Sequence, residues 1–312
     1  MFNWAFASEK LMDFTLKQLA YFAAAAETGN VSAAAARLNV SQPSISAAIA
    51  TLERCFGVTL FQRRHARGVD LTPVGQRLFA EARALLAHAQ DFQTAARGEG
   101  EALAGPLELG CFVSLAPFFL PALLAGFGQA APGIQIRPHE GDHANLCREL
   151  LSGAFELALL YDLGFEDGIA AEPVASVPLR AVLPVDHKLA RRKTVPLAML
   201  APEPFILLDL PQSADYFLAL FRARGLEPNV RHRTPSFELA RGLVAGGHGY
   251  SLLNLAPAHD RTYDGGRVVV RALDESVPPL KIVVARAAQA RATRRALAFT
   301  SHAKAFFGGK AL

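Results

Sequence analysis

The sequence has little cysteine, tryptophan or charge. Its 312 residues include three cysteines and one tryptophan, and charged residues make up 19%. Cys55, Cys111 and Cys147 stand far apart and are odd in number, and they form no C-x-x-C pair of the kind that binds zinc or exchanges disulfides. Such cysteine usage favours a protein of the reducing cytoplasm.

Long apolar runs and an excess of one charge are also missing. The uncharged stretch at residues 111–128 contains Pro117 and Pro121 and is barely as long as a membrane span, so it is interpreted as a buried strand followed by a helix. Residues 1–12 lack the basic start and the apolar core of a signal peptide. Lys and Arg number 32 against 28 Asp and Glu, so a nucleic-acid surface must come from a local cluster, and no membrane partner is expected.

The hydrophobic content and the length predict two folded units. Hydrophobic residues make up 51% of the chain, and one domain usually takes about 150 residues. A first helix is predicted to begin at the capping box of Thr15 and Gln18 and to end at Gly29. A second helix is predicted to start after Ser32 and to end at Asn39, a residue that tolerates the left-handed conformation of a turn.

A third helix and a small hairpin are predicted directly after Asn39. Ser41 is a good N-cap, and Pro43 lies in the first helical turn, where its missing N–H costs little. Alternating apolar residues at 58–60 and 69–71 predict two strands joined by a turn at 65–68. The N-terminal part is therefore expected to be an all-α winged helix-turn-helix domain.

Such a layout can place the third helix in the DNA major groove while arginines of the hairpin bind phosphates. The inserted end of the helix needs short polar side chains, and glutamine can bond an adenine edge through two atoms. A protein-interaction module of three helices is the alternative that this pattern leaves open. The residues expected to contact DNA are Ser32, Ser41, Gln42, Pro43, Ser44, Ser46, Arg63, Arg64 and Arg67.

A long helix is predicted from Thr72-Pro73 to about Arg97. Large residues recur in it every seven positions, at Leu78, Leu85 and Phe92, and an alanine follows each of them four positions later. The first domain is too small to cover so long a stripe. We therefore expect the seam to pair two subunits, and packing of the helix on its own domain is the alternative.

The remainder of the chain is predicted to form an α/β domain after a hinge at residues 98–105, which are rich in Gly, Glu and Ala. Strands alternate with helices, which indicates a largely parallel sheet. Residues 151–160 and 244–253 are similar, because each combines a helix end with a return strand, so two related halves are expected. The predicted strands are at 107–111, 134–137, 157–160, 181–183, 205–208 and 250–253.

The segment from Ser32 to Ser46, SAAAARLNVSQPSIS, closely resembles the DNA-binding domain of LysR-type transcriptional regulators. The resemblance continues through Phe56-Gly57-Val58, Leu60-Phe61-Gln62-Arg63 and Leu71-Thr72-Pro73-Val74-Gly75. It implies an extension at 1–11, the DNA-binding domain at 12–73, a linker helix at 74–97, the hinge at 98–105 and an effector-binding domain at 106–312. This last domain would resemble periplasmic binding proteins, with lobe I at about 106–177 and 279–312 and lobe II at about 178–278.

The resemblance also implies partners. They are double-stranded operator DNA, a small-molecule effector held between the lobes, and further copies of the chain in a homodimer or homotetramer; RNA polymerase is expected as well. Ser114 corresponds to the family's usual effector contact, and it is also expected to cap the first helix of the second domain.

Further effector contacts are predicted from the position of strand ends. In two-lobed α/β domains the ligand lies at the carboxyl ends of strands, where helix N-termini present N–H groups that favour a small organic anion. The candidate effector-binding residues are Ser114, Leu115, His143, Tyr161, Gln212, Ser213, Phe237 and Tyr250.

Residues 139–143 read H-E-x-x-H, which is typical of zinc hydrolases when both histidines lie on one helix face. Pro138 precedes the motif and Gly141 interrupts it, so a strand that ends in a loop is favoured, with Asp142 capping the next helix. The glycine-rich residues 246–249 follow a helix and enter a strand, which indicates a helix C-cap rather than a phosphate loop. No metal, cofactor or catalytic residue is predicted.

These patterns predict a cytoplasmic transcriptional regulator that binds DNA, senses a small molecule and is not an enzyme. The main alternative is a solute-binding protein with an appended helical domain. That alternative requires export and therefore a signal sequence.

Replacing Arg63, Arg64 or Arg67 by alanine is predicted to weaken DNA binding on all sequences alike, because phosphate contacts carry no sequence information. The slope of log affinity against log salt concentration should become shallower by about 0.9 for each phosphate that the variant no longer neutralises in each bound subunit. Fluorescence anisotropy over a salt series measures this slope. An unchanged slope would remove the residue from the interface.

Overall fold

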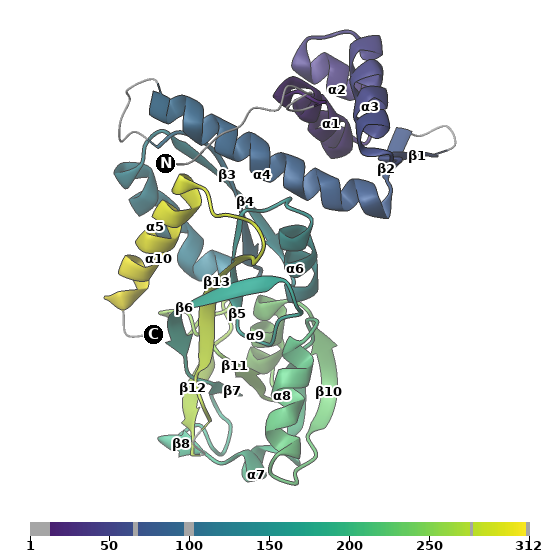
Figure 1. Ribbon diagram of the computed structural model, residues 1–312. Helices are drawn as coiled ribbons and strands as arrows, with labels where there is room; N and C mark the ends of the chain where they lie inside the picture. The colour runs from purple at the N-terminus through teal and green to yellow at the C-terminus, as the bar shows by residue number, and fades with distance from the viewer. Residues whose placement is uncertain (1–12, 65–67, 97–102, 275–276, 310–312) are drawn as a thin grey trace. The chain divides into compact units, whose positions relative to one another are not determined.

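Two compact units make up the chain, and they divide at about residue 102. The computed structural model describes residues 13–64, 68–96, 103–274 and 277–309 (Figure 1). The N-terminal unit contains α1 (Leu16–Thr28), α2 (Val31–Leu38), α3 (Gln42–Phe56), β1 (Phe61–Arg64), β2 (Gly68–Leu71) and α4 (Pro73–Ala96).

Local hydrogen bonds determine where the first three helices begin and end. Thr15 and Gln18 form the predicted capping box of α1, which ends at Gly29 in the left-handed conformation. Ser41 caps α3 as predicted. Helix α2 begins earlier than predicted, because the side chain of Asn30 accepts hydrogen bonds from the amides of residues 32 and 33. Ser32 therefore lies inside the first turn of α2.

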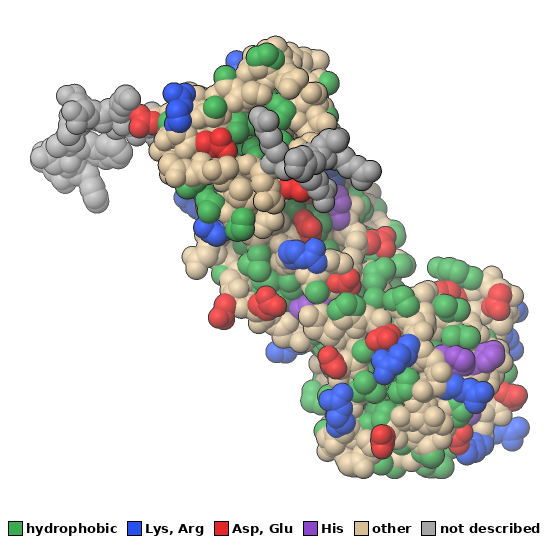
Figure 2. Space-filling model, turned by 90° about the vertical axis from the view of Figure 1, so that its right-hand side faces the viewer, with side chains coloured by type: hydrophobic (Ala, Val, Ile, Leu, Met, Phe, Trp, Pro, Cys, Tyr) green, Lys and Arg blue, Asp and Glu red, His purple; other side chains and the backbone are tan. Residues whose placement is uncertain are grey.

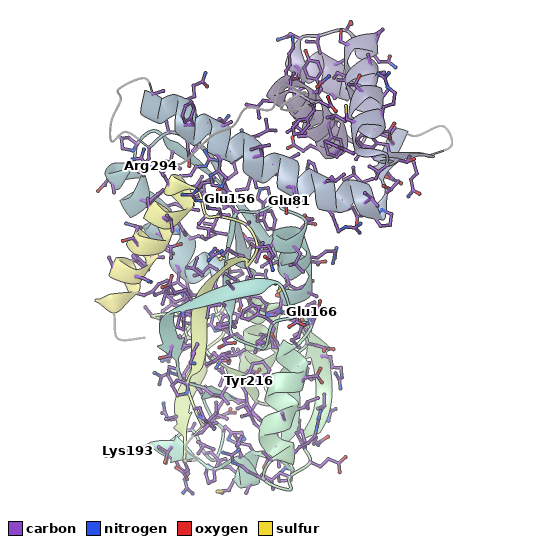
Figure 3. The ribbon with its side chains drawn as sticks, viewed as in Figure 1. Glu81, Glu156, Glu166, Lys193, Tyr216 and Arg294 are labelled. Atoms are coloured by element: carbon purple, nitrogen blue, oxygen red, sulfur yellow. The ribbon has the colours of Figure 1, made fainter. Side chains whose placement is uncertain are left out.

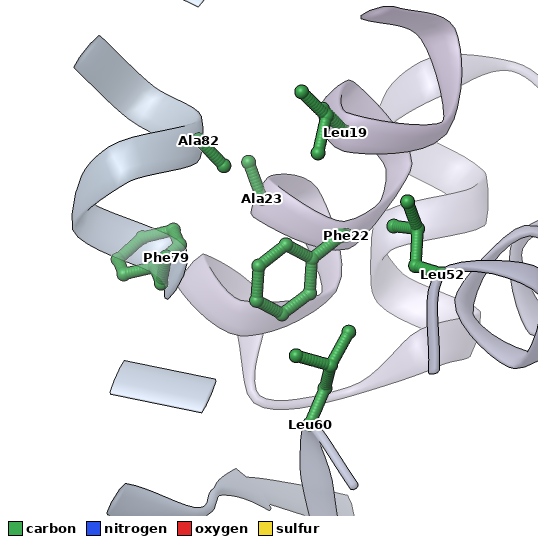
Figure 4. Packing of buried hydrophobic residues seen from close by; sticks show 7 residues of the cluster. All are labelled: Leu19, Phe22, Ala23, Leu52, Leu60, Phe79 and Ala82. Carbon is green, nitrogen blue, oxygen red and sulfur yellow. The ribbon is translucent and has the colours of Figure 1, made fainter. Parts of the chain in front are cut away.

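The core of the N-terminal unit centres on Phe22 of α1, which is 1% exposed. Its ring packs edge-on against Phe61, with the ring centroids 5.5 Å apart, and against Phe79 of α4 at 6.2 Å. Strands β1 and β2 form the hairpin, or wing, of the domain. The helices and the start of the wing share one core (Figure 4). The residues drawn there are Leu19, Phe22, Ala23, Leu52, Leu60, Phe79 and Ala82.

The wing is attached to this core through its backbone. The amide of Leu60 donates to Glu53 Oε1 of α3 at 2.7 Å, and its carbonyl accepts from the amide of Thr72 at 3.0 Å. The first strand begins at Phe61 instead of residue 58, because Leu60 is used for these bonds and is fully buried. A Cβ atom on Gly75 would lie 2.1 Å from the Leu60 carbonyl oxygen, so only glycine fits at this crossing.

Lobe I of the C-terminal unit is a five-stranded sheet in the order β4-β3-β5-β13-β6. Helices α5 and α10 pack together through the ring pair of Phe127 and Phe299, whose centroids are 5.3 Å apart, and α6 lies on the other side of the sheet (Figure 1). The elements are β3 (Gly105–Phe112), α5 (Ala116–Ala130), β4 (Ile134–Gly141), α6 (His143–Leu151), β5 (Leu157–Tyr161), β6 (Ile169–Val177), β13 (Leu280–Ala287) and α10 (Arg294–Gly308).

Lobe II contains a four-stranded sheet in the order β11-β7-β12-β8 and a two-stranded sheet of β10 and β9. Tyr250 joins the two sets, because its amide donates to the Pro204 carbonyl at 3.0 Å and its carbonyl accepts from the amide of Ile206 at 2.8 Å. The elements are β7 (Arg180–Pro184), β8 (Thr194–Val195), α7 (Leu197–Leu200), β9 (Pro204–Leu208), α8 (Ser213–Arg222), β10 (Asn229–Thr234), α9 (Phe237–Ala245), β11 (Ser251–Leu253) and β12 (Val268–Leu273).

The two lobes are related as predicted, but their sheets are mixed rather than largely parallel. Strand β13 runs antiparallel to β5 and β6, and β7 runs antiparallel to β11 and β12. Each of these strands is the first that the chain forms after it crosses from the other lobe. A crossing strand starts at the end of the lobe where the parallel strands finish, so it must run the opposite way. The pattern of alternating strands and helices did not indicate β6, β8, β10, β12 or β13.

Charged side chains of both signs are interspersed over the face of the C-terminal unit that Figure 2 shows. Many of them are paired: Lys304 of α10 bonds Glu172 of β6, and Arg267 bonds Asp260 at 2.6 Å. Within the part of the chain that the structure describes, no helix combines the length and the apolar character that a membrane crossing requires.

Phe22→Ala is predicted to lower the free energy of opening of the N-terminal unit by about 3–5 kcal/mol, because it leaves a cavity at the centre of the core. Hydrogen exchange followed by mass spectrometry on the full chain should show faster exchange in α1 and α3 and unchanged exchange in β3 and β5. Leu16→Ala is the control, because Leu16 is 46% exposed. Equal protection in the Phe22 and Leu16 variants would contradict the assigned core.

Candidate functional site

The N-terminal end of α3 presents a polar surface. Ile45 is fully buried in the unit's second apolar cluster, and Ile49 lies on the same helix face. The helical period therefore turns the residues on either side of Ile45 outward. The predicted DNA contacts that are exposed here are Ser41, Gln42, Pro43, Ser44 and Ser46 of the α3 end and Ser32 of α2.

Hydrogen bonds hold the polar side chains of this surface in place. The Ser32 hydroxyl donates to Gln42 Oε1 at 3.2 Å, which links α2 to α3. The hydroxyl oxygens of Ser41 and Ser44 are 2.7 Å apart. An amide oxygen has two lone pairs, so Gln42 retains the capacity to accept and donate at a base edge.

The structure describes the backbone of two of the three arginines predicted in the wing. Arg63 and Arg64 are the last residues of β1, paired in register with Val69 and Gly68 of β2. Arg67 lies outside the described residues. The phosphate contacts at the three positions stay predictions.

The seam of α4 divides into two parts. Leu78 packs against the core of its own unit, where Ala82 is buried. At this position the helix therefore packs on its own domain, which was the alternative to pairing of subunits. Leu85 is 43% exposed and Phe92 is 77% exposed. The core of the N-terminal unit covers Leu78 in the first turns of α4, whereas Leu85 and Phe92 are exposed.

A partly open pocket lies between the two lobes. Four of the eight predicted effector contacts line it: Ser114 and Tyr161 from lobe I, and Ser213 and Phe237 from lobe II. Tyr216 of α8 also lines it (Figure 3). The remaining lining residues are Phe112, Leu163, Leu208, Phe217, Leu253, Asn254, Leu255 and Leu280.

The other four predicted contacts do not line this pocket. Leu115 is fully buried at the start of α5, and Gln212 is exposed, with a positive φ of 61°. The ring of His143 is buried and stacks on Phe165 with the centroids 5.1 Å apart. Tyr250 is fully buried in lobe II, where it joins two sets of strands. Chain order placed all four near strand ends, but three of them are buried away from the pocket and Gln212 is exposed to solvent.

Ser114 does not cap α5, contrary to the prediction. The helix begins at Ala116 with Leu115 at the N-cap position and no side-chain cap. Ser114 lies in the preceding turn, is 6% exposed, and its hydroxyl is hydrogen-bonded to the Tyr161 phenol. The Ser114 side chain therefore forms part of the pocket wall and does not cap the helix.

The two phenols of the pocket are neutral at physiological pH. Burial raises the pKa of Tyr161, and the hydrogen bond with Ser114 opposes this only in part. Burial likewise raises the pKa of Tyr216, against the hydrogen bond from Asn254 Nδ2, which is 3.3 Å from the phenol oxygen. Both groups therefore remain O–H donors.

Asn254 and Tyr216 were not predicted as site residues. Asn254 directly follows β11, as Tyr161 ends β5, and these are the return strands of the two similar halves. The internal similarity of residues 151–160 and 244–253 was the signal that could have found Asn254. No comparable sequence pattern indicated Tyr216, because the sequence does not show which face of α8 lines a pocket.

The H-E-x-x-H residues do not form a zinc site. His139 and Glu140 belong to strand β4, whereas His143 begins α6. His139 Nε2 is 2.7 Å from Glu108 Oε2. Asp142 Oδ1 accepts from the amide of Asn145 at 2.8 Å, as predicted for a cap. Across the described ranges no cluster of three or more His, Cys, Asp or Glu side chains is arranged to hold a metal ion.

Comparisons with known proteins match both units. Residues 16–76 match the bacterial regulatory helix-turn-helix proteins of the lysR family, and residues 100–308 match the LysR substrate binding domain. The chain is 33% identical to the uncharacterized HTH-type transcriptional regulator YnfL of Escherichia coli, over 78% of this chain and 82% of that protein. It is 30% identical to the DNA-binding transcriptional dual regulator OxyR of Escherichia coli, over 80% and 82% of the two chains.

A solved structure is similar along nearly the whole chain. The PA01 protein of Pseudomonas aeruginosa, described as a LysR family transcriptional regulator, is 40% identical with a TM-score of 0.64. The match covers 95% of this chain and 100% of that one. These matches favour a regulator over the solute-binding protein and give no support to a zinc hydrolase.

Leu85→Asp is predicted to dissociate paired subunits, because it would bury an unpaired charge at a cost of several kcal/mol. Sedimentation velocity of the full chain should show a smaller species. Leu16→Asp serves as the control, since Leu16 is exposed to a similar degree, 46% against 43%. An intact assembly in the Leu85 variant would mean that the seam does not pair subunits.

Proposed function

Because the chain belongs to the LysR family of transcriptional regulators, we propose that the polar end of α3 reads its operator and that the pocket between the lobes binds its effector. The chain is a DNA-binding transcriptional regulator with an effector-binding domain. The DNA proposal rests on one observation: polar side chains at the N-terminus of α3 are exposed on either side of the buried Ile45.

In the proposed complex, Gln42 and Ser44 contact base edges in the major groove. Ser41 and Ser32 position them through the hydrogen bonds to Ser44 and Gln42. Pro43 and Ser46 complete the surface, while Arg63, Arg64 and Arg67 of the wing bind phosphates. Sequence preference would then come from α3, and most of the salt dependence would come from the wing.

The proposed assembly is a homodimer or homotetramer in which Leu85 and Phe92 of two α4 helices pair. Their exposure supports this arrangement, because large apolar side chains that recur on one helix face favour association. A regulator that binds DNA acts in the cytoplasm, and contact with RNA polymerase would transmit the signal. The relatives that the chain matches are transcriptional regulators, and we propose no catalytic role for this chain.

Gln42→Ala is predicted to change sequence preference more than overall affinity. Loss of a two-atom contact to one base should remove about 1–3 kcal/mol of discrimination at that position of the site. Selection of binding sites from a random duplex library by the full chain, before and after the substitution, measures this.

The matched control is Gln90→Ala, an exposed glutamine of α4 outside the proposed surface. Its selected sites should equal those of the unsubstituted protein. If Gln42→Ala selects the same sites with the same stringency at every position, the proposed reading role of Gln42 is wrong.

A further inference from the structure

The pocket between the lobes has an unusual lining for a site that was expected to bind an anion. None of the described residues that line it carries a charged side chain. Eight of its thirteen lining residues are Phe or Leu, and two more are tyrosines. Burying a carboxylate in such a pocket without a cationic partner is costly, because its hydration is lost and no opposite charge replaces it.

The polar groups of the pocket come as two hydrogen-bonded pairs, one from each lobe. Ser114 bonds Tyr161 in lobe I, and Asn254 bonds Tyr216 in lobe II at 3.3 Å. Tyr161 and Asn254 stand at equivalent ends of the related strands β5 and β11. The pocket therefore offers neutral donors and acceptors from both lobes, together with apolar residues.

Helix dipoles favour negative charge at helix N-termini, but several first-turn amides of α5 and α9 are already bonded. At the start of α5, Pro117 has no N–H, and the amides of Phe118 and Phe119 both donate to the Leu115 carbonyl at 3.1 Å. At the start of α9, the Ser236 hydroxyl accepts from the amide of Leu239 at 3.2 Å. The amides of Phe118, Phe119 and Leu239 are thus already bonded within the chain.

Aromatic rings form the walls of the pocket. Phe112 meets Tyr161 edge-on, with the ring centroids 5.3 Å apart. Phe237 of lobe II meets Phe118 of α5 edge-on at 5.4 Å, so the two lobes are in contact through this pair. Rings held in this way favour a flat aromatic molecule, which can make edge and face contacts with them.

We propose that the effector is an uncharged, flat aromatic molecule with a hydrogen-bonding group at each of two opposite edges. One group bonds the Ser114–Tyr161 pair and the other bonds the Tyr216–Asn254 pair, so the ligand holds the two lobes together. This ligand class rests on the proposed effector role of the pocket. It replaces the small organic anion that the helix dipoles alone had suggested.

Three probes that differ chiefly in charge test the ligand class: para-hydroxybenzamide, which is neutral, para-hydroxybenzoate, an anion, and para-hydroxybenzylamine, a cation. Isothermal titration of the full chain at neutral pH is expected to give at least about tenfold tighter binding of the amide than of either ion, because only the ions lose hydration without a charged partner. Tighter or equal binding of the benzoate or of the amine overturns the ligand class. Absence of binding by the amide overturns it as well.

Tyr216→Phe tests whether the ligand occupies this pocket. Removal of the hydroxyl should weaken amide binding about two- to tenfold. The matched control is Tyr263→Phe in the same lobe, where the side chain is 90% exposed and outside the pocket, and it should bind the amide as the unsubstituted chain does. Circular dichroism melting verifies that both variants are folded.

A second variant separates failure of the ligand class from failure of the pocket. Ser114→Leu removes the lobe I hydroxyl and fills space in the pocket, so it should abolish binding of the amide. If the benzoate binds instead and both Tyr216→Phe and Ser114→Leu weaken it, the pocket remains the effector site and the uncharged ligand class is wrong. If the amide binds and neither substitution changes its affinity, the proposed effector role of the pocket is wrong.

Discussion

The passage of the chain between the two lobes is the constraint on which the ligand pocket depends. The chain leaves lobe I after β6 and returns to it with β13. The crossing strands β7 and β13 begin at the junction and run against β11 and β5, whose carboxyl ends therefore face the junction. Tyr161 and Asn254 stand at these two strand ends, so the same topology that divides the domain also brings its polar groups to one pocket.

The chemistry of the pocket follows from competition between helix dipoles and the side chains around them. Helix N-termini favour an anion when their amides are free. In this protein a proline, a turn carbonyl and a serine cap occupy the first turns of α5 and α9, and neutral hydroxyl and amide groups face the cavity. We infer that desolvation of a carboxylate outweighs the attraction of the dipoles, and we therefore favour an uncharged ligand.

The N-terminal unit combines a small core with two surfaces that the core leaves uncovered. Phe22 and Ile45 turn inward, and the helical period then exposes the polar end of α3 on one side. The first turns of α4 complete the core through Phe79, whereas Leu85 and Phe92 extend beyond it. A single helix thus belongs to the DNA-binding domain at one end and is available to a second subunit at the other.

The sequence by itself determined the features that depend on neighbours a few residues apart. The capping box at Thr15, the N-cap at Ser41 and the exposed end of α3 follow from hydrogen bonds and periodicity within single helices. The similarity of the two halves was also visible in the sequence. Tertiary structure alone decided that Tyr250 belongs to the core of lobe II, that Ser114 bonds Tyr161 instead of capping α5, and that the sheets are mixed. These outcomes depend on contacts between strands far apart in the chain, which no local pattern specifies.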